Sequence, residues 1–145
     1  MTRDATASIV RINPPELGMP PGYSQVVDVS AGRIIFISGQ TALDRSGNVV
    51  GKQDFGAQAE QVFANLATAL QARGCTAAHL VKLTVFLTDM DNLGSYREAR
   101  NRFFASVTPP AAPAVTLVEV SKLYAPDFLI EIEAIAAGER HAFTS

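Results

Sequence analysis

Disulfides and long apolar runs are both missing from this sequence. Cys75 is the single cysteine in 145 residues, which excludes an internal disulfide and is typical of a protein in a reducing cytoplasm. The longest apolar stretches are too short to cross a bilayer, and no charged segment followed by an apolar one opens the chain. We therefore expect a cytoplasmic location and no membrane partner.

Positive charge is also scarce. The chain has 12 Lys and Arg against 14 Asp and Glu, a formal net charge of -2, and its basic residues are scattered. A nucleic-acid partner requires a basic stripe or patch, so none is expected. His79 and His141 have no metal-like spacing to Cys75, and no glycine-rich phosphate loop is present. We predict neither a metal site nor a cofactor.

Hydrophobic residues, in contrast, are abundant: they make up 48% of the chain, against 18% for charged residues. A chain of 145 residues is long enough to bury the core of one domain. We therefore interpret residues 1–145 as a single domain, with a strand and a proline-rich loop in 1–20 and a tail in 138–145. A surface with so few charges favours a homo-oligomer, in which part of it is buried.

The spacing of apolar residues predicts six strands and two helices. Asp54 can cap the first helix, and Gly74 is a natural stop for it. Segments 24–29 and 33–39 are interpreted as a hairpin around Ala31 and Gly32. The second helix is predicted over 92–106, and the strands are 8–12, 24–29, 33–39, 79–88, 114–120 and 127–136.

This order of elements favours an α+β domain in which two helices cover one face of a mixed six-stranded sheet. Two helices are too few to cover both faces. The second face needs another cover, and copies of the chain that pack sheet to sheet are the simplest one.

The last predicted strand holds two carboxylates in an apolar segment. Glu131 and Glu133 point to one face of the strand, because successive side chains alternate, while the neighbouring Ile130 and Ile132 point to the other. Adjacent acids raise each other's pKa and can supply a general acid or a water-positioning base. The alternative is a half-exposed antiparallel strand whose polar face lies in water.

Two further segments are candidates for ligand binding. Gly39 ends a predicted strand after Ser38, and a glycine there lets a ligand approach the backbone closely, although such glycines also occur in ordinary turns. Tyr23 follows the proline-rich loop, where a tyrosine is either a packing residue or a ligand contact.

Taken together, these segments resemble the Rid/YjgF family of reactive enamine and imine deaminases. The resemblance runs from about residue 21 to residue 136 and rests on four motifs in family order: PGYSQ (21–25), ISGQ (37–40), TVFLTDM (84–90) and EIEAIA (131–136). It implies a chorismate-mutase-like fold, a homotrimer whose sheets form an inner β-barrel, and small-molecule clefts between neighbouring subunits.

The resemblance also implies roles for individual residues. In the family's deaminases a glutamate positions the water that hydrolyses the imine, and this role falls on Glu131. The family's tyrosine, serine and glycine fall on Tyr23, Ser38 and Gly39. Asp91 stands where the family has an asparagine, and Leu117 where a cysteine is frequent.

One family residue has no counterpart in the matching segment. The arginine that clamps the substrate carboxylate falls on Val115, and residues 113–123 contain no arginine. Losing such a charge-assisted partner costs about 2–5 kcal/mol. The sequence therefore predicts a divergent member, a hydrolytic deaminase of a small imine or enamine other than the usual 2-imino acid. The alternative is a non-catalytic trimer that binds a small molecule or a partner protein in the same cleft. A nuclease activity is disfavoured by the net negative charge.

Overall fold

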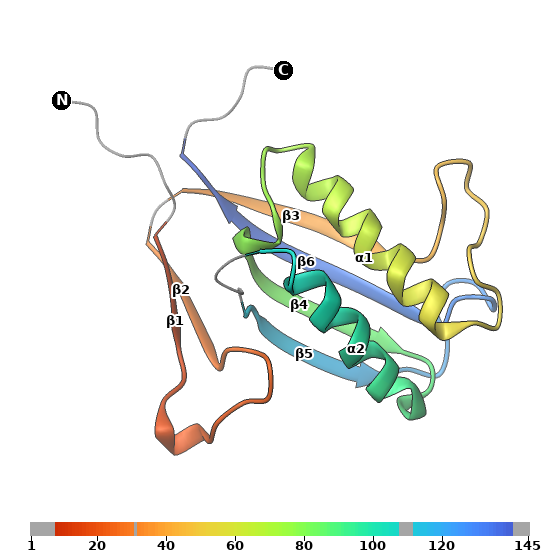
Figure 1. Ribbon diagram of the computed structural model, residues 1–145, viewed down its shortest axis with the longest axis horizontal. Helices are drawn as coiled ribbons and strands as arrows, with labels where there is room; N and C mark the ends of the chain where they lie inside the picture. Colours follow the sequence, from red (N-terminus) through yellow and green to blue (C-terminus); the bar gives the residue numbers. More distant parts are fainter. Residues whose placement is uncertain (1–7, 31, 108–111, 141–145) are drawn as a thin grey trace.

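The computed structural model describes residues 8–30, 32–107 and 112–140, and it contains two helices and six strands there (Figure 1). His141 and parts of the predicted 1–20 and 138–145 segments lie outside these ranges. The strands are β1 (Ile9–Ile12), β2 (Val26–Val29), β3 (Arg33–Gln40), β4 (Leu80–Leu87), β5 (Ala114–Glu119) and β6 (Ile130–Gly138). The helices are α1 (Phe55–Gln71) and α2 (Leu93–Phe104), and short 3-10 turns include η3 (Met90–Asn92). The predicted α+β class is confirmed.

The strands divide into two groups, which corrects the single six-stranded sheet expected from the sequence. β3, β6, β4 and β5 form a four-stranded sheet in that order, with β4 and β5 parallel and the other pairs antiparallel. β1 and β2 form a separate antiparallel pair. An isolated bridge from Ser24 to Ala114 links the segment before β2 to the edge of the larger sheet, and the Arg11 Nε of β1 donates to the Ala112 carbonyl oxygen at 3.1 Å.

The predicted hairpin of 24–29 with 33–39 is wrong. β2 pairs with β1, with Ile9 opposite Val29, while β3 pairs with β6. Gly32 has a φ of +112°, which turns the chain out of β2. The nine-residue β6 offers the eight-residue β3 a longer hydrogen-bonded partner than the four-residue β2 does. Local sequence cannot reveal this preference, because it depends on a strand about 100 residues away.

The ends of α1 follow the sequence signals. The Asp54 Oδ1 accepts a hydrogen bond from the Ala57 N–H at 3.1 Å, which is the expected N-cap. After the helix, Gly74 takes a φ of +71°, and the Cys75 N–H donates to the Leu70 carbonyl at 2.9 Å. No helix in the described ranges has the length and apolar composition needed to span a membrane.

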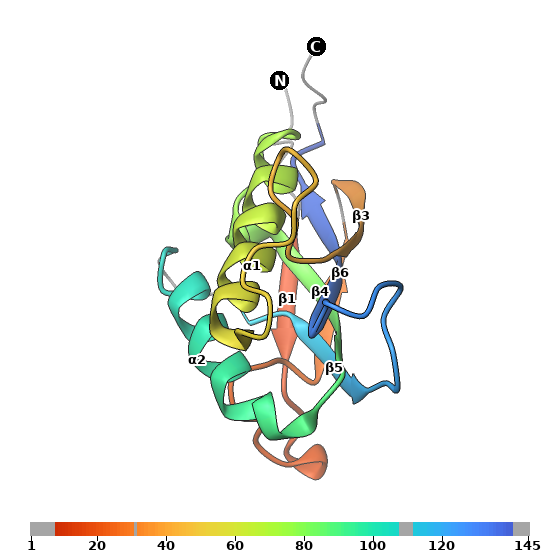
Figure 2. The same ribbon diagram turned by 90° about the vertical axis from the view of Figure 1, so that its right-hand side faces the viewer.

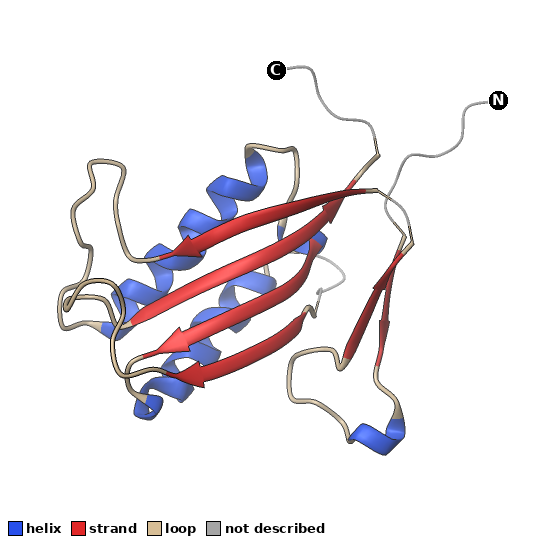
Figure 3. Ribbon diagram, turned by 180° about the vertical axis from the view of Figure 1, so that it is seen from behind, coloured by secondary structure: helices blue, strands red, loops and turns tan. Residues whose placement is uncertain are grey.

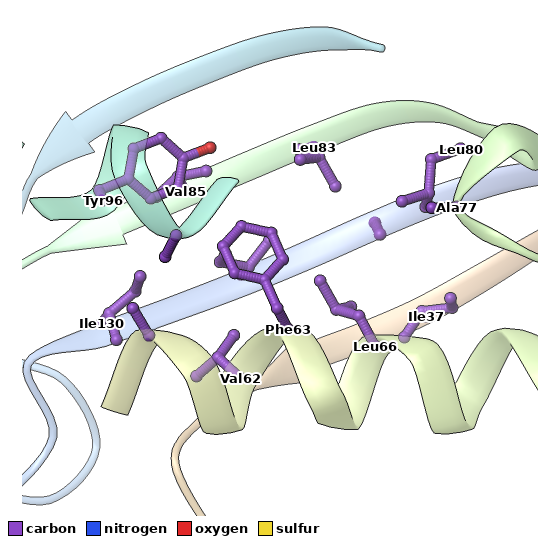
Figure 4. Packing of buried hydrophobic residues seen from close by; sticks show 14 of the residues in the cluster. Ile37, Val62, Phe63, Leu66, Ala77, Leu80, Leu83, Val85, Tyr96 and Ile130 are labelled. Atoms are coloured by element: carbon purple, nitrogen blue, oxygen red, sulfur yellow. The ribbon is translucent and has the colours of Figure 1, made fainter. Parts of the chain in front are cut away.

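Both helices lie on one face of the larger sheet, and the core lies between them and the strands (Figure 2). Leu66 of α1 and Tyr96 of α2 face the strand residues Leu83, Val85 and Ile130 across this layer, and all five are almost completely buried (Figure 4). Strand alternation explains the arrangement, because every second side chain of β4 and β6 points toward the helices.

The opposite face of the sheet carries no helix (Figure 3). Large apolar side chains are exposed on it: Phe36 is 77% exposed, Ile34 50% and Val118 38%. Exposed large apolar side chains on an uncovered sheet face favour an interaction surface. Glu131 and Glu133 share this face, because their neighbours Ile130 and Ile132 point into the core.

We expect copies of the chain to cover this open face as a trimer. Light scattering should give three times the 15.4 kDa protomer mass at micromolar concentration. Phe36→Asp should dissociate the assembly, because it places a charge on the apolar face. Met19→Asp is the matched control: Met19 is 86% exposed but lies outside the larger sheet. A wild-type protein that stays monomeric would contradict the prediction.

Candidate functional site

Glu131 and Gly39 meet on the open face of the sheet. The pairing of β3 with β6 shifts register between Ile37 and Gln40, so the strand is irregular at Gly39. A Cβ atom built on Gly39 would overlap the Glu131 Oε2. Glycine is therefore the only residue that leaves the carboxylate in this position.

Ser38 lies on the same face. It is exposed, like Phe36 two residues earlier, while the intervening Ile37 points into the core. The Gln40 Nε2 donates to the Ser38 carbonyl oxygen at 3.0 Å, which leaves the Ser38 side chain outside this contact. The structure thus brings three of the predicted residues, Ser38, Gly39 and Glu131, to one end of β3 and β6.

The environment of Glu131 disfavours its ionised form. Partial burial raises the pKa of this carboxyl, and the like charge of Glu133 raises it further. The effect of the adjacent acid was predicted from the sequence, and the direction of the pKa shift is confirmed. Such a shift moves a carboxylate toward the range in which it exchanges protons with substrate and water near neutral pH.

From the family resemblance we expect Val115 and Leu117 to lie beside the Glu131 carboxylate in the substrate cleft, but within the protomer they lie on the other face of the sheet. They pair with Leu83 and Val85 of β4, which are fully buried under the helices. Glu131 pairs instead with Phe86, whose β5 partner is the exposed Val118. Adjacent strands keep paired side chains on one face, so within a protomer these two positions cannot contact Glu131.

A second group of predicted residues lines a cavity of about 350 Å³ between β5, α2 and the loop before β2. This cavity brings Tyr23 together with Val115 and Leu117. Asp91 is not among the lining residues: it is exposed in η3, and its backbone N–H donates to the Asp89 Oδ1 at 2.9 Å. Its neighbour Met90 lines the cavity in its place.

Six of the nine lining residues were not predicted from the sequence as site residues, and three of these six carry polar groups. Tyr96, Arg97 and Arg100 all come from α2 and line the same cavity. Tyr96 is 1% exposed, and burial raises the pKa of its phenol to about 12. The spacing of Tyr96 and Arg100, four residues apart on a helix, was a usable signal, because it places both side chains on one face.

Lys122 lies away from both the Glu131 cluster and the cavity that holds Tyr23. Lys122, the one basic residue between Arg102 and Arg140, lines a separate cavity with Tyr124 and Phe128. In the described part of the chain, no three His, Cys, Asp or Glu side chains gather as a metal ion would require.

The raised pKa of Glu131 predicts a pH-dependent stability. The folded state binds the proton of Glu131 more tightly than the unfolded state, so this group stabilises the fold below its usual pKa. That contribution is lost as the pH rises through the raised pKa. The Glu131→Gln variant has no carboxyl group at this position and therefore does not lose this contribution. The free energy of unfolding of the variant, relative to that of the wild type, should increase as the pH rises from about 4 to about 7.

Denaturant unfolding of both proteins over this pH range measures the effect. Glu98→Gln, which removes an exposed carboxylate from α2, is the matched control and should follow the wild type. A Glu131→Gln protein that unfolds or dissociates at every pH would instead identify Glu131 as a structural anchor.

Comparison with known proteins yields one family and many relatives. The family model described as Endoribonuclease L-PSP matches residues 17–138, a range that includes every strand and helix from β2 to β6. The 2-iminobutanoate/2-iminopropanoate deaminase of Mus musculus is 37% identical over 116 residues, which cover 79% of this chain and 79% of that protein.

Solved structures agree with this result. YyfB from Yersinia pestis, a protein of unknown function of the conserved Rid family, has a TM-score of 0.80 and 34% identity, covering 89% of this chain and 98% of that one. TdcF from E. coli with bound serine has a TM-score of 0.66 and 30% identity, covering 83% of this chain and 91% of that one.

Proposed function

The chain belongs to the Rid/YjgF family and has its chorismate-mutase-like fold, and from this premise we propose that it is a hydrolytic deaminase of a small imine or enamine. Glu131 is the catalytic residue and activates the attacking water. The contact of Glu131 with Gly39 carries the proposal, because it holds a carboxylate of raised pKa at a backbone without a side chain. The named activity of the mouse relative supports this reaction class.

The active site is composite in this proposal. Glu131, Gly39 and Ser38 lie on the open face of the sheet, whereas Tyr23, Val115 and Leu117 line the cavity on the helix side. One protomer cannot bring these groups to one small substrate, because the sheet separates them. A homotrimer with an inner β-barrel joins them, if the open face of each copy meets the cavity of its neighbour.

The reaction follows from the chemistry of a carboxylate beside a C=N bond. The Glu131 carboxylate accepts a proton from water while the water oxygen bonds to the imine carbon, and the C=N electron pair moves to nitrogen. Glu131 returns the proton to this nitrogen. The hydroxyl proton then moves to nitrogen as the C–N bond breaks, which releases ammonia and leaves a ketone. An enamine enters the same path after protonation at carbon.

The walls of the cavity set the substrate class. Val115 offers no charge at the position where the family resemblance places the carboxylate clamp, so β5 does not hold a 2-imino acid in the usual way. Val115 and Leu117 instead contact an apolar part of the substrate. The bound serine of TdcF supports a small molecule as the ligand of this fold.

Ammonia release from a panel of imines generated in solution tests the function. Glu131→Gln should lower turnover by roughly a hundredfold or more, the usual scale for loss of a general base. Glu98→Gln is the matched control, because it removes an exposed carboxylate from α2 outside both clusters, and it should retain the activity. If no imine is hydrolysed by the wild type, the proposal fails.

Gly39→Ala tests the contact that carries the proposal. The new methyl group would overlap the Glu131 carboxyl and displace it, so turnover should fall by about tenfold or more, on the scale of a misplaced catalytic group. Gly94→Ala is the control, because a Cβ at Gly94 meets no atom within 4 Å. Equal turnover of Gly39→Ala and wild type would show that Glu131 does not act from this position.

A non-catalytic binding protein is the second candidate, and the uncharged β5 wall of the cavity favours it. In that case the trimer and its ligand binding persist while ammonia release is absent for every imine. The name of the family model refers to an endoribonuclease, but RNA cleavage is disfavoured, because the net charge of -2 offers no basic surface for a phosphate backbone.

A further inference from the structure

Arg100 is a buried cation without an acidic partner among the described residues. The residue is only 9% exposed, and its Nε and Nη2 donate to the neutral Asn101 side-chain oxygen at 3.3 and 3.1 Å. None of the ion pairs among the described residues includes it. A buried charge is destabilising unless an opposite charge or a full set of hydrogen bonds compensates it.

Tyr96, one helical turn earlier on α2, is also buried with a polar group that lacks a hydrogen-bond partner among the described residues. This group is the tyrosine hydroxyl. The Arg100 Cζ lies 6.0 Å from the centre of the Tyr96 ring, and Figure 4 shows this ring in the core near Val85. The raised pKa of the phenol keeps the hydroxyl protonated at neutral pH, so that it can donate. A buried donor without an acceptor costs about 1–3 kcal/mol.

Both residues line the cavity that holds Tyr23 and Val115. We propose that Arg100 and Tyr96 form a carboxylate-binding subsite, with the guanidinium and the phenol as its donors. An arginine fork grips a carboxylate through two parallel hydrogen bonds, and the phenol supplies a third. The proposal rests on the proposed function, since the carboxylate belongs to the imine substrate.

The loop before β2 leaves room for this arginine. Gly22 has a φ of +90°, and a Cβ atom on it would lie 2.7 Å from the Arg100 Nη2. The guanidinium therefore packs against bare backbone beside Tyr23. Arg97, which is exposed and lines the same cavity, adds positive charge and favours entry of an anion.

This subsite changes the substrate expected from the sequence. β5 offers no charge at Val115, and for this reason the sequence predicts a substrate other than the usual 2-imino acid. α2 supplies the charge from another wall of the cavity, while Val115 and Leu117 keep an apolar surface. The substrate is therefore an imine of a 2-oxo acid with a small apolar side chain, held by Arg100 of α2 instead of an arginine on β5.

Binding of two inert probes tests the subsite without catalysis. Pyruvate carries the carboxylate, and pyruvamide replaces it by a neutral amide of similar shape. Calorimetry on the full-length wild-type protein should show pyruvate bound about tenfold or more tightly than pyruvamide, the scale of hydrogen bonds to a charged group. Arg100→Gln should abolish this preference, and Tyr96→Phe should reduce it by several-fold.

Arg102→Gln is the matched control, because Arg102 lies on the same helix but is exposed and pairs with Glu60. Its preference for pyruvate should equal that of the wild type. If Arg100→Gln does not fold, Arg100→Lys and Tyr96→Phe test the subsite in its place. Each of them should still lower the preference for pyruvate over pyruvamide. The double variant Arg100→Gln with Val115→Arg should regain pyruvate binding, which loss of a merely structural arginine would not allow.

Two results separate this inference from the proposed function. If the wild type hydrolyses imines but neither Arg100 nor Tyr96 variants change the preference for the acid over the amide, the subsite is overturned and the function stands. If the wild type hydrolyses no imine but prefers pyruvate in an Arg100-dependent manner, the subsite stands and the function fails. Equal binding of both probes by the wild type overturns the subsite.

Discussion

The central position of β6 controls the rest of this structure. β6 pairs with β3 on one side and β4 on the other, and its side chains alternate between the two faces of the sheet. Ile130 and Ile132 pack under the helices, while Glu131 and Glu133 point to the open face. A shift of one residue in either pairing would bury two carboxylates in the core and expose two isoleucines, so the register is strongly determined.

The same alternation separates the candidate functional groups. The carboxylate and the glycine that accommodates it lie on one face, and the cavity with Tyr23 and Val115 lies on the other. In the proposed trimer, the Glu131 cluster of one copy and the cavity of its neighbour are two half-sites of one active site, and neighbouring copies cover the exposed apolar side chains. Residues of the proposed inner barrel would then be functional as well as structural.

Buried polar and charged groups that destabilise the fold are concentrated in these half-sites. The Tyr96 hydroxyl, which has no hydrogen-bond partner in the described ranges, and the buried Arg100 charge destabilise the isolated fold, and so does the partly desolvated Glu131. Proteins retain such features where a ligand or a reaction uses them. The core that tolerates them is apolar and almost completely buried between α1, α2 and the strands, and it holds these groups in place.

The sequence by itself determined the α+β class, the ends of α1 and the faces to which Glu131 and Ile132 point, because caps and side-chain alternation depend on near neighbours. Its motifs, through the family resemblance, also named Ser38, Gly39 and Glu131 as candidate site residues. Only the tertiary structure decided that β3 pairs with β6 instead of β2, that Val115 lies across the sheet from Glu131, and that Arg100 enters the cavity of Tyr23. Each of these depends on which distant segments pair, and many segments of similar apolar pattern compete for that pairing until the whole core is formed.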